Sequence, residues 1–528
     1  MEKTGNTNNK RKHKKMAKSQ KGITLVALVI TIIIIIILAT VAINFALSDN
    51  GLIRTAEQAS DFYANDTKYT DDSITNVESY IDGIMPEEPF TPQPTPEPEQ
   101  GETELADMTN GVIEIKWLSG TSNYVSETPN APEIKEDLPD GTTMELVRYT
   151  GEESTEQERW VAGTEYSYVA GAGASDNTSS KWANARVTID GIDSYFVWIP
   201  RYAYRIIYFD TAESKIAYQE GNLTEEAAVA SGQIIGYSDS RGIVDAEGKK
   251  VANAASTTKI MVSEDYFMTH PAFMNGTETG FKNGEWDSEL SGLWIGKYEA
   301  SLVNKADGTN IVPGSSTNGD ILLSDPEHTD KTVATKPGYN SWSYIRIDKI
   351  YDNAKYYSTE LNSHMLKNSE WGAVAYLTES KYGRNGTEIN QNTLYYTGGG
   401  RGSLYEENTL QSSTGNVYGI YDLSGCHYEY VAGCCDDIDT IGGNNEYATA
   451  YENTDSNQAS QYYKYGDATY ETSGWHLDYT SFVNSETKFF IRGGYIYNNT
   501  DYSGVFFSRG EYYGTYANDS FRLALCVE

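Results

Sequence analysis

The longest run of hydrophobic residues lies close to the start of the chain, at residues 23–47. Only four polar side chains interrupt it, and a helix of that length would extend roughly 35 Å, enough to cross a bilayer. Eight lysines and arginines precede the run, between Lys3 and Lys21, and basic residues favour the cytoplasmic side of a membrane. The pattern predicts a single-pass protein of the cell membrane whose C-terminal part is extracellular.

Hydrophobic residues continue at helical spacing after the run, so we expect an amphipathic extension of the helix to residue 84. A solvated stalk helix is the alternative. Residues 85–104 are rich in Pro, Glu and Thr, a composition typical of an extended linker of roughly 3 Å per residue.

Short alternating runs follow, such as 112–117 and 144–149, separated by Gly, Pro, Asn and Asp. A period of two is typical of strands, and we expect a small β-rich module over residues 105–183. Residues 184–528 are rich in Gly, Tyr, Trp and Asn and show few helical periods, so we expect one larger domain there. Together with the N-terminal helix, these elements predict an α+β fold class.

The formal net charge of −35 argues against a nucleic-acid partner, because DNA and RNA are themselves strongly negative. The four cysteines lie in the last fifth of the chain, at Cys426, Cys434, Cys435 and Cys526, which is too few for a disulfide scaffold. The sequence leaves open whether one or two disulfide bridges form.

The sequence KGITL at 21–25, between the basic residues and the hydrophobic run, resembles the leader of type IV prepilins. The resemblance implies a basic leader, residues 1–22, which a prepilin peptidase removes after Gly22. It also implies methylation of Ile23 and a pilin-like helix over residues 23–84.

Ala27 departs from this family, which usually has Glu at the fifth mature position. The resemblance therefore leaves open whether the chain assembles with other pilin subunits in a pilus. The alternatives are a structural minor pilin or pseudopilin subunit, and a plain membrane anchor that is never cut.

Several segments of the larger domain resemble, in this order, the formylglycine-generating enzyme (sulfatase-modifying factor) family. They are SYFVWIPRYAYRI at 194–206, GLWIGKYEAS at 292–301, HMLKNSEWGAVAYLTESKYG at 364–383, GNVYGIYDLSGCHYEYVAG at 415–433, FIRGGYIY at 490–497 and SFRLALC at 520–526. The best matches are Asn416, Gly419, Tyr421, Asp422, Gly425, Glu429, Val431, Arg492, Gly493, Gly494, Phe521 and Arg522. The resemblance implies a variant of the C-type lectin fold.

Members of that family that make formylglycine use two cysteines shortly after the Gly-Gly pair, with copper and oxygen. Residues 495–503 contain no cysteine, and Asn498 and Ser503 stand about where the thiols should be. Neither side chain can act as a thiolate. We therefore expect no enzymatic activity, no catalytic residue and no cofactor, with a formylglycine-generating oxidase as the disfavoured alternative.

The segment that replaces the thiols, residues 495–520, is a run of Tyr, Asn, Asp, Ser, Phe and Gly. Tyr offers a large contact area with little rotamer entropy to lose, and Asn, Asp and Ser offer adaptable hydrogen bonds. We expect it to bind a cell-surface protein or glycan through Tyr495, Tyr497, Asn498, Asn499, Asp501, Tyr502, Phe507, Arg509, Glu511, Tyr512, Tyr513 and Tyr516.

This segment is similar to the C-terminal variable region of lectin-fold proteins diversified by retroelements. The resemblance implies a surface adhesion or recognition protein. The alternative is that the tyrosines form aromatic ladders on a β-hairpin.

Metal sites have weak support in the sequence. Glu429, Asp436, Asp437 and Asp439 could offer oxygens to calcium, although a solvated acidic loop is the preferred interpretation. Cys426 and His427 lie close to Glu429, but we expect no zinc site there.

Overall fold

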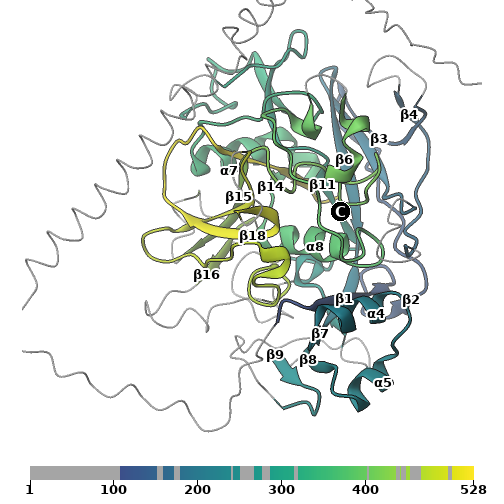
Figure 1. Ribbon diagram of the computed structural model, residues 1–528. Coiled ribbons are helices and arrows are strands. Elements are labelled where there is room, and N and C mark those ends of the chain that lie inside the picture. The colour runs from purple at the N-terminus through teal and green to yellow at the C-terminus, as the bar shows by residue number, and fades with distance from the viewer. Residues whose placement is uncertain are drawn as a thin grey trace, which may run out of the picture. The chain divides into compact units, whose positions relative to one another are not determined.

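The computed structural model describes residues 108–527 with several internal gaps (Figure 1). The segments left out within this range are 152–158, 172–178, 240–241, 250–266, 276–285, 314–318, 401–403, 436–440, 442–446, 452–464 and 497–501. The chain divides into two compact units, Met1–Pro96 and Glu97–Glu528, and every described residue belongs to the second. The predicted leader, pilin-like helix and linker, with Gly22 and Ile23, lie outside the described residues.

The described part of the chain is mainly β, and the predicted α+β class is wrong. Strands hold 33% of the described residues and helices 17%. The prediction combined a long N-terminal helix with a C-terminal domain that was also expected to be α+β. The described segments are instead short runs of β-branched and aromatic residues between glycines, which fit a pleated, half-buried surface.

None of the helices in the described residues is both long and apolar enough to span a bilayer. The two longest have 11 and 12 residues, whereas a membrane span needs about 20. This finding contradicts the predicted transmembrane helix and the predicted single-pass location in the cell membrane. The predicted span itself, residues 23–47, lies outside the described residues.

The first sheet has the strand order β2-β1-β7-β8-β9, with β10 also paired to β7. Its strands are β1 (Gly111–Leu118), β2 (Val125–Ser126), β7 (Tyr202–Phe209), β8 (Ile234–Asp239), β9 (Gly242–Asp245) and β10 (Met268–Thr269). In β1 the residues alternate between buried and half-buried up to Trp117, as the sequence alternation predicts.

The second sheet has the order β14-β20-β11-β6-β5-β3-β4. Its strands are β3 (Thr142–Tyr149), β4 (Trp160–Ala162), β5 (Asn184–Ile189), β6 (Ile192–Pro200), β11 (Gly292–Gly296), β14 (His364–Met365) and β20 (Leu523–Leu525). A separate pair joins β12 (Ser301–Asn304) to β13 (Lys331–Ala334). Strands of the predicted 105–183 module thus pair with strands of the larger predicted domain in both sheets.

The chain passes from the second sheet into the first through a single residue, Arg201, between β6 and β7. Its guanidinium is buried and donates to the carbonyl oxygens of Phe273 (2.7 Å) and Leu290 (3.2 Å), and it pairs with Glu289 (2.5 Å). A buried arginine is stable only when its donors are satisfied, so these contacts fix the crossing point.

Few helices accompany the sheets in the described residues. They are α4 (Ala212–Gln219), α5 (Glu225–Ala230), α7 (Ile347–Tyr357) and α8 (Asn368–Glu379), with 3-10 turns at η1 (Pro271–Phe273), η3 (Thr359–Leu361), η4 (Thr397–Gly399), η5 (Leu404–Glu407), η6 (Thr409–Gln411) and η9 (Trp475–Leu477). Helix α8 is almost wholly buried and contacts β1, β6 and β15, one strand from each of the three larger sheets (Figure 1). It therefore forms the centre of the core.

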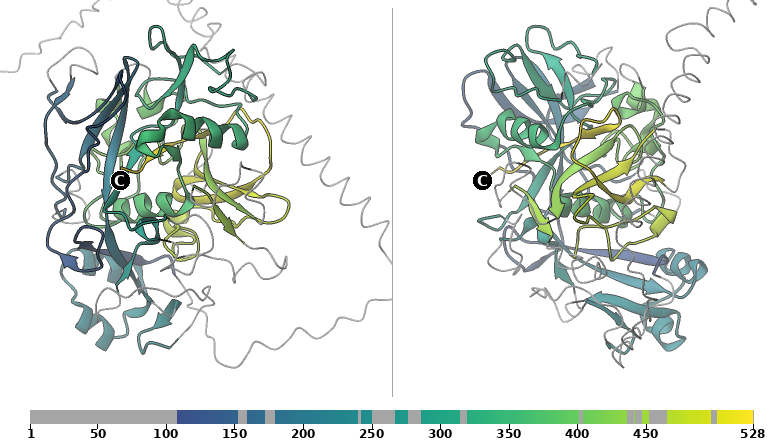
Figure 2. Two further views of the ribbon diagram at one scale, coloured as in Figure 1. Left: turned by 180° about the vertical axis from the view of Figure 1, so that it is seen from behind. Right: turned by 90° about the vertical axis from the view of Figure 1, so that its left-hand side faces the viewer.

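The third, C-terminal sheet has the order β16-β15-β17-β18, with β19 also paired to β15. Its strands are β15 (Tyr428–Cys435), β16 (Thr449–Tyr451), β17 (Phe489–Gly494), β18 (Ser503–Glu511) and β19 (Asp519–Phe521). In both views of Figure 2 the blue and teal strands of the first sheet lie below the yellow-green strands of this sheet. The sheet contains the described part of the predicted binding segment.

Candidate binding surface

The two faces of the C-terminal sheet are identified by its register. Tyr430, Ile491 and Arg509 lie opposite one another across β15, β17 and β18, and Glu429, Arg492 and Ser508 form the neighbouring row. Side chains of successive residues point to opposite faces of a sheet. We call the side with Tyr430 and Arg509 the front face and the other side the inner face.

The inner face packs into the core against α8. The indole Nε1 of Trp371 donates to the carbonyl oxygen of Val505 (2.8 Å). The buried guanidinium of Arg492 donates to the carbonyl oxygen of Ala468 (2.8 Å) and lies 5.5 Å from the ring of Trp371. The residues of the inner face therefore have a structural role.

The front face has an aromatic floor. The rings of Tyr428 and Phe507 stack with centroids 5.6 Å apart, and Tyr428 stacks in turn with Tyr495 at 5.7 Å. All three are buried. The guanidinium carbon of Arg509 lies 5.2 Å from the ring centre of Tyr428, and Arg509 pairs with Glu511 (2.5 Å). Because the Arg509 side chain is 36% exposed, it presents a cation above this floor.

Four exposed tyrosines lie near the two ends of β18, and we call them the aromatic rim: Tyr479, Tyr502, Tyr512 and Tyr513. Tyr479 and Tyr502 are each 40% exposed, and their rings stack with centroids 5.1 Å apart. Tyr513 donates its hydroxyl to Oδ1 of Asp348 on α7 (3.0 Å). The nine residues of β18, which separate Tyr502 from Tyr512, extend roughly 30 Å at about 3.3 Å per residue.

Asp519 lies buried on the front face, beside Tyr428 in the parallel pairing of β19 with β15. Neither of its carboxylate oxygens accepts a hydrogen bond of good geometry within the described chain, although the hydroxyl of Tyr430, which donates to the carbonyl oxygen of Tyr512 (3.0 Å), lies close enough to lower the pKa of Asp519. Burial raises the pKa of Asp519 well above its usual value, and the neighbouring Glu511 raises it further. The burial of Asp519 therefore lowers the stability of the folded state at neutral pH.

The predicted binding residues are thus divided among different environments. Tyr502, Tyr512 and Tyr513 are exposed, Arg509 and Tyr516 are partly exposed, and Tyr495, Phe507 and Glu511 are buried. Tyr497, Asn498, Asn499 and Asp501 lie outside the described residues. The assignment of these residues to ligand binding stays a prediction.

The calcium candidates are divided in the same way. Asp436, Asp437 and Asp439 lie outside the described residues. Glu429 is buried, and its two carboxylate oxygens accept from Nε (2.9 Å) and an Nη atom (2.5 Å) of Arg522. All four cysteines are buried, and none of them forms a disulfide bridge.

Tyr479 was not among the predicted binding residues. It reaches the surface beside Tyr502 because residues 478–481 run next to β18, with a bridge between Thr480 and Ser508. Tyr479 lies outside the Tyr-rich segment, and no local pattern marks it. Only the tertiary pairing brings it there.

A groove lies on the first sheet, with a volume of about 670 Å³, and its lining includes Glu114, Arg205, Tyr218, Glu225 and Phe267. Its charged groups bind one another, since Arg205 pairs with Glu114 (2.7 Å) and with Glu225 (2.7 Å). These contacts favour a structural role for the charges that line the groove.

No family model matches this chain, and no curated protein matches it. The resemblances to type IV prepilins, to the formylglycine-generating enzyme family and to retroelement-diversified proteins therefore stay predictions. The function has to be argued from the geometry of the site.

Proposed function

We propose that this chain is a recognition protein that binds a protein or glycan on a cell surface through the aromatic rim of its C-terminal sheet. The observation that carries the proposal is the concentration of exposed tyrosines. Within the described residues, four of the six tyrosines that are markedly exposed, Tyr479, Tyr502, Tyr512 and Tyr513, belong to the rim. The other two are Tyr124 and Tyr356.

The chemistry of the rim suits a macromolecular ligand. An exposed tyrosine ring offers a large, rigid contact area and a hydroxyl for hydrogen bonding, and such residues are often the energetic centres of interfaces. Arg509 adds a partly exposed cation between the two ends of β18. A surface that extends roughly 30 Å is too long for a small ligand to cover.

The inner face of the same sheet gives the rim a rigid support. Phe507 is fully buried, and the inner face is fixed to α8 through Trp371 and Arg492. Residues on the rim can therefore vary without loss of the core beneath them. This division supports the further proposal that a retroelement diversifies residues of the 495–520 segment.

The proposal is tested with fluorescently labelled full-length protein and intact bacterial and animal cells. A variant with Tyr502, Tyr512 and Tyr513 all replaced by Ser is compared with a control in which Tyr124 and Tyr356 are replaced by Ser. We expect the control to bind like the unaltered protein and the rim variant to bind roughly tenfold or more weakly, because rim aromatics act as hot spots. Thermal unfolding of each variant checks that the fold is kept.

Treatment of the cells separates the two ligand classes. Protease treatment should abolish binding to a protein, whereas periodate oxidation should abolish binding to a glycan. Equal binding by the unaltered protein and a folded rim variant would contradict the proposal, and so would equal losses in the rim variant and the control.

A further inference from the structure

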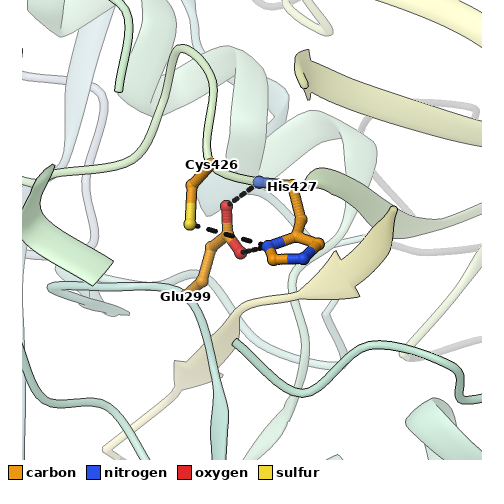
Figure 3. Close-up of side chains that lie close together, drawn as sticks. All are labelled: Glu299, Cys426 and His427. Carbon is orange, nitrogen blue, oxygen red and sulfur yellow. Dashed lines mark hydrogen bonds and ion pairs between the residues drawn. The ribbon is translucent and has the colours of Figure 1, made fainter. Parts of the chain in front are cut away.

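Three metal-binding side chains converge beside the start of β15, where Figure 3 shows them turned toward one another. Glu299 comes from the connection between β11 and β12, and Cys426 and His427 come from the turn just before β15. All three are buried. His427 packs against Tyr395 (5.5 Å between ring centroids) and Tyr495 (5.9 Å).

The separations of the donor atoms fit tetrahedral coordination. Sγ of Cys426 lies 3.6 Å from Nδ1 of His427, and that Nδ1 lies 3.6 Å from Oε2 of Glu299. In a tetrahedral zinc site, bonds of about 2.0–2.3 Å place neighbouring ligand atoms about 3.3–3.6 Å apart. All three donor atoms lie within 4.8 Å of one another, so small movements of the side chains would let a single ion reach them.

The Glu299 oxygen that faces His427 accepts no hydrogen bond of good geometry in the described part of the chain, although the hydroxyl of Ser341 lies close to this carboxyl group. The distance of 3.6 Å from this oxygen to Nδ1 of His427 exceeds the hydrogen-bond range. The other oxygen, Oε1, accepts from the backbone N–H of His427 (3.0 Å), and the hydroxyl of Ser341 lies against Sγ of Cys426 (3.3 Å). A buried carboxylate oxygen without a donor is costly unless a cation binds it.

Buried carboxylates outnumber the cations that lie close to the site. The carboxylates of Asp422 and Glu429 are buried near Glu299. The guanidinium of Arg522 is held by both oxygens of Glu429. Lys297 directs its ammonium to Asn184 and to carbonyl oxygens. A divalent cation would supply the charge that balances these carboxylates.

The backbone at the site is also unusual. Cys426 has a φ of 63°, in the left-handed region that residues other than glycine rarely adopt, directly after Gly425 at 80°. Strained backbone of this kind persists where the surrounding structure fixes it, and it is concentrated at functional sites. Here it turns the Cys426 and His427 side chains toward the same point (Figure 3).

We propose that Oε2 of Glu299, Sγ of Cys426 and Nδ1 of His427 bind one Zn²⁺ ion. The mixed sulfur, nitrogen and oxygen set suits zinc, whereas calcium prefers oxygen donors alone. Binding releases the thiol proton of Cys426, and the carboxyl proton of Glu299 where it is present, to solvent. Three protein donors leave one coordination position for water.

The zinc site is independent of the proposed binding function. It joins Glu299 in the β11–β12 connection to His427 in the turn just before β15, and these two residues lie 128 positions apart in the sequence. The sequence places Glu429 near Cys426 and His427, but that carboxylate binds Arg522. Glu299 provides the oxygen donor.

The test measures metal in the full-length protein expressed in medium supplemented with zinc. Glu299→Gln and Cys426→Ser remove one donor each with little change in volume, and Cys434→Ser alters another buried cysteine as the control. We expect about one zinc per chain in the unaltered protein and the control by mass spectrometry of the metal. Competition with a chelator should show zinc affinity at least roughly tenfold lower in the two donor variants.

A second measurement uses cobalt and the unaltered protein. It tests the proposed zinc site even if a variant fails to fold. Expression with Co²⁺ should produce a thiolate-to-cobalt charge-transfer band in the near ultraviolet and intense tetrahedral bands in the visible. The proposal is overturned by unaltered protein that holds no zinc even after incubation with it. Bound cobalt without the thiolate band, or folded donor variants with unchanged affinity, would overturn it as well.

Discussion

At the scale of single residues, Arg522 joins several distant segments. Its guanidinium donates to both carboxylate oxygens of Glu429 and to the carbonyl oxygens of Gly296 (2.9 Å) and Tyr421 (2.9 Å). The planar fork of arginine makes this set of contacts possible, and lysine cannot reproduce it. One side chain thus ties the second sheet to the C-terminal sheet.

We expect Arg522→Lys to lower the free energy of unfolding by about 3 kcal/mol or more, because two or more charge-assisted hydrogen bonds are lost in the core. Urea unfolding measures the change. Arg148→Lys is the control, since Arg148 is exposed. Equal urea midpoints for Arg522→Lys and the unaltered protein would show that the contacts of Arg522 contribute little.

In contrast to Arg522, replacement of Asp519 is expected to raise the free energy of unfolding. Burial, then Glu511, raises the pKa of Asp519 well above the 3.8 of the free side chain, although Arg509 lowers it. Between these two pKa values the folded protein keeps a proton that the unfolded chain has lost. The free energy of unfolding therefore falls as the pH rises through this range.

Asp519→Asn removes this loss, since the amide does not ionise. We expect the variant to be more stable than the unaltered protein at pH 7 by about 1–3 kcal/mol, with a smaller gain near pH 4. Urea unfolding at both pH values tests it, and Asp210→Asn, at an exposed position, is the control. A gain that does not change with pH would mean that ionisation of Asp519 is not its source.

At the scale of elements, the 3-10 turn η9 is joined to the end of α8 by an ion pair. Nε2 of His476 lies 3.0 Å from Oε2 of Glu379, with Lys215 on the other side of that carboxylate. Burial alone would lower the pKa of His476, but Glu379 raises it above 6.5, with a smaller contribution from Asp478, while Lys215 acts against it. The folded state therefore binds this proton more tightly than the unfolded chain does.

The contribution of this pair is complete below pH 6.5 and is lost as the pH rises through the folded pKa of His476. We expect His476→Gln to cost about 1–2 kcal/mol at pH 5.5 and less at pH 8.5. Urea unfolding at both pH values checks this, with His328→Gln as the control. A larger cost at pH 8.5 than at pH 5.5 would contradict the assignment.

Elements also show how far the sequence could predict this structure. The alternation at 112–117 and 144–149 predicts strands, and β1 and β3 lie there. The Tyr-rich segment predicts contact chemistry, but the pattern cannot tell which tyrosines face inward. Tyr495 is buried and Tyr502 is exposed, although they lie next to the paired residues Gly494 and Ser503, and no local pattern encodes this difference.

At the scale of the whole molecule, the segments chosen for their resemblance do come together. GLWIGKYEAS contains β11, which pairs with β20 in SFRLALC, and β15 pairs with β17 and β19. The partners themselves could not be predicted, because pairing depends on surfaces formed by distant segments. Glu299 near Cys426 and Tyr479 near Tyr502 both arise in this way.

The predicted fold class was wrong for a related reason. It gave weight to one strongly hydrophobic segment near the start, whereas the described residues are dominated by short strands. Helix α8 is an exception among these short strands. It is buried on nearly all sides, so its sequence lacks the amphipathic period from which a helix is usually predicted. Gly372 within it allows the close approach of the backbone at Gly466, where a Cβ atom would lie 1.8 Å from the carbonyl oxygen.

The late strands β19 and β20 have a consequence for how the protein is made. β20 lies between β14 and β11, and β19 completes the edge of β15, so neither sheet is finished until residues 519–525 have left the ribosome. Until then the nascent chain carries unpaired strand edges that could join a neighbouring chain. Both sheets can therefore close only after residues 519–525 have been made, and the open edges before that point favour pairing between neighbouring chains.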